Sequence, residues 1–211
     1  MLLQEINERV ATLTLNRPDK HNALSQSLRD DLVNRLKEIE GNNDVDVAII
    51  TGAGPSFCAG FDLAEFQGGD TEQTFSHAIE YHREVYTFSK PLIAAVNGRA
   101  LAGGMDLAAM CDLRIVSSEA VFGQPQVKMG IDVAFDLMKT VLPEAIARDI
   151  CLTGRIMTGE ESVAYGFANE TTDPDALMKR CSEIAMIISE SGHSMKKKAE
   201  FKTLQPDLFK T

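Results

Sequence analysis

Apolar runs and amphipathic stretches alternate along the chain, and the pattern predicts both strands and helices. Residues 1–15 predict two short strands, because apolar and polar side chains alternate over the second of them. Apolar residues then recur at helical spacing, so we expect a helix over 25–41 with Gly41 as its stop. Further runs predict strands at 45–50, 91–98 and 113–118, and a helix at 71–88. This alternation indicates an α/β fold.

The second half of the chain is predicted to be richer in helix. The pattern predicts two or three helices over 135–190, and it predicts no strand from residue 171 onward. We therefore divide the chain into a core at 1–170 and a helical C-terminal segment at 171–211, a candidate to pack on a neighbouring subunit. Its apolar helical residues would form that contact: Ile184, Ala185, Ile187 and Ile188.

Composition limits the classes of protein that this chain can belong to. With 211 residues, 44% hydrophobic and 25% charged, the chain fits one globular domain, or one domain with a small appendage. No apolar run approaches the roughly 20 residues of a membrane span, and the N-terminus lacks the pattern of a secretory signal. The net charge of −10 disfavours a nucleic-acid partner, because no broad basic surface is available to displace counterions.

The four cysteines are widely spaced and form no CxxC pair. This spacing argues against a zinc site and against a disulfide scaffold, and it fits a reducing cytosol. We therefore expect a cytoplasmic protein without a bound metal.

Two glycine-containing turns are the main candidates for chemistry. One turn, at 58–60, precedes a predicted short helix from Phe61, and the other, at Gly103 and Gly104, opens a second helix. The first amides of a helix have no intrahelical acceptor and lie at the positive end of its dipole. Two such N–H groups that meet at one oxygen stabilise an oxyanion, an effect of roughly 3 to 4 kcal/mol per donor. Each turn taken alone favours tight packing of a glycine-rich helix start.

Taken together, in order and with their flanks, these stretches resemble the crotonase family, also called the enoyl-CoA hydratase/isomerase superfamily. The matching pieces are "NRPDKHNAL", "AIITGAGPSFCAGFDL", "KPLIAAVNGRALAGGMDLAAMCDLRIVSSEAVFGQPQVKMGI" and "LTGRIMTGEESVAYGFANE". The resemblance covers residues 1 to about 190. It implies a spiral of repeated ββα units, binding of acyl-coenzyme A thioesters, and assembly into a homo-oligomer, a trimer or hexamer.

The resemblance also implies roles for individual residues. The backbone amides of Phe61 and Gly103 would form the oxyanion hole for the thioester oxygen. Coenzyme A, as part of the substrate rather than as a separate cofactor, would lie along two segments of the chain. The residues implied for that binding are Lys20, Ala23, Leu24, Ala59, Asp62 and Leu63.

The proton-transferring residues depart from the family's pattern. Family hydratases use two glutamates that share one water, and this chain has Asp106 at the first position and Gln126 at the second. Gln126 cannot act as a base, because an amide does not titrate near neutrality, so we place it among the substrate-binding residues. Asp106 is one methylene shorter than glutamate, which changes its reach by about 1.5 Å.

A later loop offers two further acids, Asp132 and Asp136, near the place where certain family isomerases and dehalogenases carry a catalytic aspartate. We take Asp106 and Asp132 as the candidate proton carriers. A structural cap, a buried hydrogen-bond acceptor or a loop role is the alternative for these acids.

Two functions of different class stay open. One is an enzyme of the hydratase or isomerase type that forms a thioester enolate; decarboxylation, hydrolysis and dehalogenation belong to the same class. The other is an acyl-CoA binding paralogue that has lost its chemistry, which the glutamine at position 126 favours.

Elsewhere, His77 and His82 are five residues apart on a predicted helix, so we expect a solvated helix face rather than a metal site.

Overall fold

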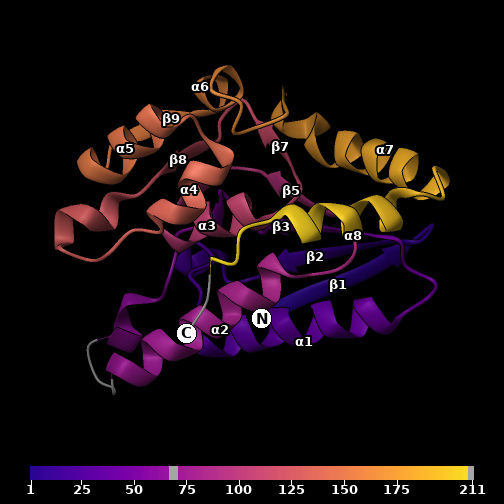
Figure 1. Ribbon diagram of the computed structural model, residues 1–211, viewed down its shortest axis with the longest axis horizontal. Helices are drawn as coiled ribbons and strands as arrows, with labels where there is room; N and C mark the ends of the chain where they lie inside the picture. Colours follow the sequence, from indigo (N-terminus) through magenta and orange to yellow (C-terminus); the bar gives the residue numbers. More distant parts are fainter. Residues whose placement is uncertain (67–70, 209–211) are drawn as a thin grey trace.

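The computed structural model describes residues 1–66 and 71–208 and contains two β-sheets (Figure 1). The larger sheet has six strands in the order β1-β2-β3-β5-β7-β10, with β1 antiparallel to β2 and the other neighbours parallel. Its strands are β1 (Leu2–Asn7), β2 (Val10–Leu15), β3 (Val47–Gly52), β5 (Leu92–Val96), β7 (Leu113–Ser117) and β10 (Glu170–Thr172). The strands predicted from the apolar runs are therefore present.

The smaller sheet has four short strands in the order β4-β6-β8-β9. These are β4 (Ser56–Cys58), β6 (Arg99–Leu101), β8 (Val121–Gly123) and β9 (Ile156–Thr158). The first three run parallel, and β9 is antiparallel to β8. Three residues are too few to show an alternating pattern, which is why the sequence did not predict these strands.

Three consecutive ββα units connect the two sheets. In each unit the first strand (β3, β5 or β7) belongs to the large sheet and the second (β4, β6 or β8) belongs to the small one. Each second strand leads to a helix: α2 (Thr71–Tyr86), α3 (Gly103–Met110) or α4 (Phe135–Val141). Because the units repeat side by side, the expected crotonase-like spiral of ββα units is confirmed.

Helices cover both faces of the large sheet (Figure 1). On one face lies α1 (Gln26–Gly41), whose N-cap is Ser25, with α2 packed against it; on the other lies α7 (Leu177–Glu190). Alternate residues of β3 separate the two cores: Ala48 and Ile50 belong to the larger cluster, and Val47 and Ile49 to the cluster beneath α7.

The C-terminal part differs from the expectation in two respects. Four helices, not two or three, lie within 135–190, since α5 (Glu144–Thr153) and α6 (Gly159–Ala164) follow α4 and precede α7. A strand also continues past residue 171, because β10 pairs with β7. The expected boundary after residue 170 thus falls inside a strand of the sheet.

The apolar face of α7 packs on its own chain. Ala185 is buried in the cluster shared with β3, β5 and β7, and Ile184 and Ile188 pack against that cluster, whereas Ile187 is 64% exposed. The segment after residue 171 is therefore integrated into the fold. The final described helix, α8 (Ser194–Leu204), places the buried Lys198 in an ion pair with Asp112, which is half-buried.

Candidate active site

Three loops meet where the parallel strands of the small sheet end. One loop follows β4 and reaches Phe61, the second follows β6 and reaches Gly103, and the third follows β8 and begins with Gln124. Because β4, β6 and β8 are parallel neighbours, their carboxyl ends lie at one edge of the sheet. The edge formed by the carboxyl ends of parallel strands is a common place for ligand sites.

The amides of Phe61 and Gly103 lie close together at this edge. A Cβ placed on Gly103 would be 3.5 Å from the Phe61 nitrogen, and one placed on Gly60 would be 3.0 Å from the Gly103 nitrogen. Gly103 is the first residue of α3, so its N–H has no acceptor within the helix. The two amides can therefore serve one oxygen, as an oxyanion hole requires.

The residue before this pair has a strained backbone. Ala102 has φ of 50° and ψ of −126°, a conformation that L-residues other than glycine rarely adopt. Its amide donates to the Gly123 carbonyl and its carbonyl accepts the first helical hydrogen bond, from Asp106. These bonds on both sides hold the strained peptide, whose ψ angle sets the direction of the Gly103 N–H.

Close packing requires the two glycines at the start of α3. A Cβ on Gly104 would lie 2.0 Å from the Cys58 carbonyl oxygen, and one on Gly103 would lie 2.9 Å from the Phe61 ring. The sequence left open whether these glycines serve packing or an oxyanion. In the structure, the close contact with the Cys58 carbonyl is by itself enough to require glycine at position 104. The same contact holds the start of α3 near the loop that carries the Phe61 amide.

The two segments expected to bind coenzyme A lie side by side. Leu24 and Phe61 form a parallel β-bridge. Within it, the Leu24 amide donates to the Gly60 carbonyl at 2.8 Å and the Asp62 amide donates to the Leu24 carbonyl at 3.3 Å. Backbone hydrogen bonds therefore fix the first segment directly beside the Phe61 amide.

The side chains of these two segments differ in exposure. Lys20 is exposed at the end of a 3-10 helix, Leu24 is buried, Ala23 and Ala59 are half-buried, and Leu63 is 46% exposed. Asp62 forms an ion pair with Arg17 at 3.0 Å, and Arg17 also donates to the Ala23 carbonyl. The charge of Arg17, which lies just before the first segment, is neutralised by Asp62. The exposed lysine that the first segment offers to an anionic ligand is Lys20.

Asp106 lies inside the protein, in the first turn of α3. Its side chain is 6% exposed, and its Oδ1 accepts a hydrogen bond of 2.8 Å from Gln124 Nε2. Gln126 Nε2 in turn donates to Gln124 Oε1 at 2.5 Å, so the residue at the family's second glutamate position reaches Asp106 through one intermediary. Burial raises the pKa of Asp106 to about 7, against the lowering effect of the Gln124 hydrogen bond.

His82 belongs to the same cluster, contrary to the prediction of a solvated helix face. Its side chain is 12% exposed, and its Nε2 lies 3.8 Å from Asp106 Oδ2. Burial lowers the pKa of His82 to about 4, so the imidazole is neutral at physiological pH. The sequence held a signal for this position, because Ala78, Tyr81 and Val85 place His82 on the buried face of α2.

The later acids lie elsewhere on the surface. Asp132 is exposed and lines a pocket of about 400 Å³ together with Phe135, Arg148 and Cys151. Burial first, and then the charge of Asp106, raise the pKa of the Cys151 thiol to about 11. Asp136 is 70% exposed and pairs with Lys139.

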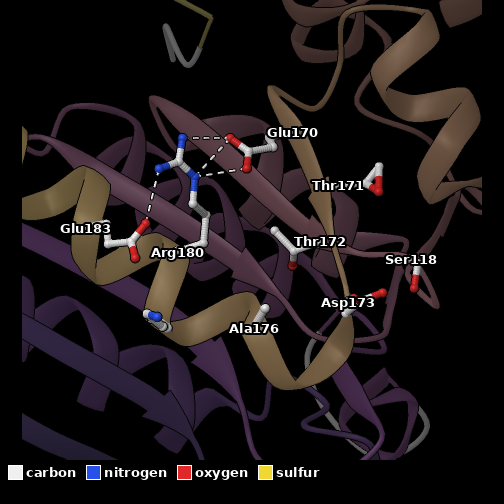
Figure 2. Close-up of a pocket in the computed structure, with 9 residues that line it drawn as sticks. Ser118, Glu170, Thr171, Thr172, Asp173, Ala176, Arg180 and Glu183 are labelled. Atoms are coloured by element: carbon white, nitrogen blue, oxygen red, sulfur yellow. Dashed lines mark hydrogen bonds and ion pairs between the residues drawn. The ribbon is translucent and has the colours of Figure 1, made fainter.

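Figure 2 shows a different hollow, between β10 and the start of α7. The Arg180 guanidinium points toward Glu170 and Glu183 and forms ion pairs with both. Because two carboxylates surround this cation, the hollow does not favour the phosphates of an anionic ligand.

The described part of the chain offers neither a metal-binding cluster nor a membrane-spanning helix. Over residues 1–66 and 71–208, no cluster of three histidine, cysteine or acidic side chains is arranged to hold a metal ion. In the same residues, every helix is too short or too polar to cross a bilayer.

Comparisons with known proteins show which family and fold this chain is similar to. The chain matches the family model for enoyl-CoA hydratase/isomerase over residues 5–205. It is 35% identical over 191 residues to the short-chain-enoyl-CoA hydratase of Clostridium acetobutylicum, covering 87% of this chain and 73% of that protein. It is 34% identical over 183 residues to the (E)-benzylidenesuccinyl-CoA hydratase of Thauera aromatica, covering 82% and 70% respectively. A crystal structure of the Bacillus anthracis enoyl-CoA hydratase superposes with a TM-score of 0.92 at 29% identity, covering 98% of this chain and 84% of that one.

Proposed function

Because this chain belongs to the enoyl-CoA hydratase/isomerase family, we propose that it adds water to the double bond of an enoyl-coenzyme A thioester. The observation that carries the proposal is the placement of a buried carboxyl group, Asp106, one helical turn after a pair of adjacent backbone amides, those of Phe61 and Gly103. The donors stabilise negative charge on the thioester oxygen, and the carboxyl group transfers a proton.

The electrostatics of Asp106 suit this role. Burial raises its pKa to about 7, so both the acid and its conjugate base are populated near neutral pH. A group whose pKa matches the working pH is an effective proton carrier. Gln126 donates a hydrogen bond to Gln124, and Gln124 donates one to the Asp106 carboxyl group. Gln126 cannot itself move a proton, so its role in the proposal is to position Asp106 through Gln124.

The coenzyme A portion of the substrate would lie along the bridged segments at 20–24 and 59–63. Lys20 would face its phosphates, and the half-buried alanines leave room for the pantetheine chain. No separate cofactor enters this proposal. A homo-oligomer, a trimer or hexamer in the cytoplasm, remains the expected form, and sedimentation of a monomer at working concentration would contradict it.

The test is a hydration assay on a short trans-2-enoyl-CoA, followed by the loss of the conjugated-thioester absorbance. We expect turnover by the wild-type chain. A parallel assay with a trans-3-enoyl-CoA gains the same absorbance if the chain is an isomerase instead. Tight binding of a saturated acyl-CoA without either reaction would identify an acyl-CoA binding paralogue and overturn the proposed function.

A further inference from the structure

His82 lies against both parts of the site. Its Nε2 is 3.8 Å from Asp106 Oδ2, and its ring packs edge-on against the Phe61 ring, with centroids 5.6 Å apart and an angle of 75° between the planes. Phe61 supplies one of the two oxyanion amides. The centroid of the Tyr81 ring lies 5.4 Å from that of His82 and 6.3 Å from that of Phe61. These contacts place an imidazole beside the carboxyl group and the oxyanion hole at once.

The orientation of the ring determines which nitrogen faces the site. A hydrogen bond to the backbone of Ala78, one turn earlier in α2, holds the imidazole. A carbonyl can only accept, so the ring donates an N–H there, and Nε2 is the nitrogen directed toward Asp106. In the neutral ring Nδ1 then carries the hydrogen and Nε2 presents a lone pair.

The groups around the imidazole keep it neutral before the reaction. Burial is the main cause of its lowered pKa, and the Arg29 guanidinium on α1 adds to the effect. Asp106 on α3 faces it as a carboxyl group that is partly protonated near pH 7. Tyr81 is buried beside it with its pKa raised well above the usual value, so the phenol is also neutral.

We propose that His82 is the second acid–base residue of the hydration, in the role that family hydratases give to a second glutamate. The inference rests on the proposed function. It follows from the distance between His82 Nε2 and Asp106 Oδ2, because one water oxygen can reach both atoms across 3.8 Å with two hydrogen bonds of about 2.8 Å.

The reaction then balances with these two groups alone. The water oxygen forms a bond to Cβ of the enoyl group, while one of its O–H bonds breaks and that proton goes to His82 Nε2. The π electrons of the double bond move to the thioester oxygen, which the Phe61 and Gly103 amides stabilise as an enolate. Asp106 then gives its proton to Cα, and the C=O bond re-forms.

The site returns to its starting state by one proton transfer. After the reaction His82 is an imidazolium and Asp106 a carboxylate, and the opposite charges at 3.8 Å stabilise each other. The proton then passes from His82 to Asp106. Because the pair is neutral before the reaction and an ion pair after it, no net charge enters the buried site.

The test compares His82→Gln, which cannot take up a proton near neutral pH, with His82→Phe, which keeps a ring against Phe61. We expect both variants to lose turnover at least ~100-fold and to keep KM within about threefold. In His82→Ala, added imidazole should restore part of the turnover, an effect that a purely structural role does not give. His193→Gln, at an exposed histidine before α8, is the matched control and should match the wild type.

Each outcome decides the matter. Wild-type turnover in His82→Gln, or no rescue of His82→Ala by imidazole, overturns the role of His82 while the proposed function stands. An inactive wild type overturns the proposed function itself. Should the variants fail to fold, the wild-type ¹⁵N shift of His82 Nε2 is followed against pH. A step near pH 7, where Asp106 ionises, supports the proposal, and a flat shift overturns it.

Discussion

The site consists of two halves that are built by different means. The backbone half comprises the amides of Phe61 and Gly103, which neighbouring parallel strands and a β-bridge hold in place. The side-chain half comprises Asp106, His82 and the two glutamines that connect to Asp106 through hydrogen bonds. The first half agrees with the family's expected oxyanion hole, whereas the second differs from the family's two glutamates.

This difference separates what the fold provides from what selects the reaction. Backbone amides keep their positions under most side-chain replacements, because strand pairing fixes them. Side chains on α2 and α3 can change without moving those amides, so one scaffold can support several reactions. The predictions below test whether the two halves are separable, and they run from the largest expected effect to the smallest.

The largest loss of stability is expected in the backbone half, from Gly104→Ala. The new Cβ would lie 2.0 Å from the Cys58 carbonyl oxygen, so α3 must move away from the loop that carries Phe61. We expect the free energy of unfolding to fall by roughly 2 kcal/mol or more, with weaker binding of saturated acyl-CoA. Urea unfolding and calorimetry measure the two effects. Unchanged stability and affinity would contradict the close packing described here.

An intermediate effect is expected in the side-chain half, from the pH dependence of stability in Asp106→Asn. The folded pKa of Asp106, about 7, lies above the unfolded value of 3.8, so the native state binds more protons over this window. The contribution of Asp106 to stability is therefore largest at low pH and is lost as pH rises through 7.

Asparagine removes that loss. Relative to wild type, Asp106→Asn should gain up to about 1.4 kcal/mol of unfolding free energy per pH unit between pH 4 and 7. His82 has the opposite sign, since its folded pKa of about 4 lies below the unfolded 6.5, and it remains in both proteins. Urea unfolding at several pH values gives the difference. A gap between the two proteins that does not change with pH would refute the buried, titrating carboxyl group.

The smallest effect is expected from Ala102→Gly. Glycine adopts a φ of 50° without the steric cost that a Cβ imposes, and the Gly103 N–H is retained. We expect the free energy of unfolding to rise by about 1 kcal/mol, because the relief of strain is only partly offset by the greater chain entropy of glycine in the unfolded state. Turnover should be unchanged. A thermal-shift series with Ala95→Gly, at a buried strand position, provides a destabilised control.

The sequence predicted the regular parts of the molecule, and it indicated Phe61 and Gly103 as the oxyanion amides, a role that stays a prediction. Long apolar and amphipathic runs predicted the strands and helices of the large sheet, and the flanked glycine turns located Phe61 and Gly103. The three-residue strands of the small sheet carry no readable period. Their pairing nevertheless brings the loops at 58–61, 102–103 and 124–126 together.

The role of His82 could not be assigned from its own neighbourhood in the sequence. Its spacing from Ala78 and Val85 indicates the buried face of a helix, but its approach to Asp106 depends on packing between α2 and α3. The connection from Gln126 to Asp106 likewise depends on Gln124, whose side chain points inward only because β8 ends beside β6. Long-range packing, rather than local pattern, determines the side-chain half.

The most direct test of the separation between the two halves measures binding and turnover in the same variant, Asp106→Asn. Calorimetry with butanoyl-CoA gives the affinity for the thioester, and the absorbance assay with a trans-2-enoyl-CoA gives the turnover. We predict an affinity within about twofold of wild type, because the amides are untouched, and a turnover at least ~100-fold lower. Turnover at the wild-type rate would show that Asp106 does not carry the proton. A parallel loss of affinity would show that the two halves are not separable.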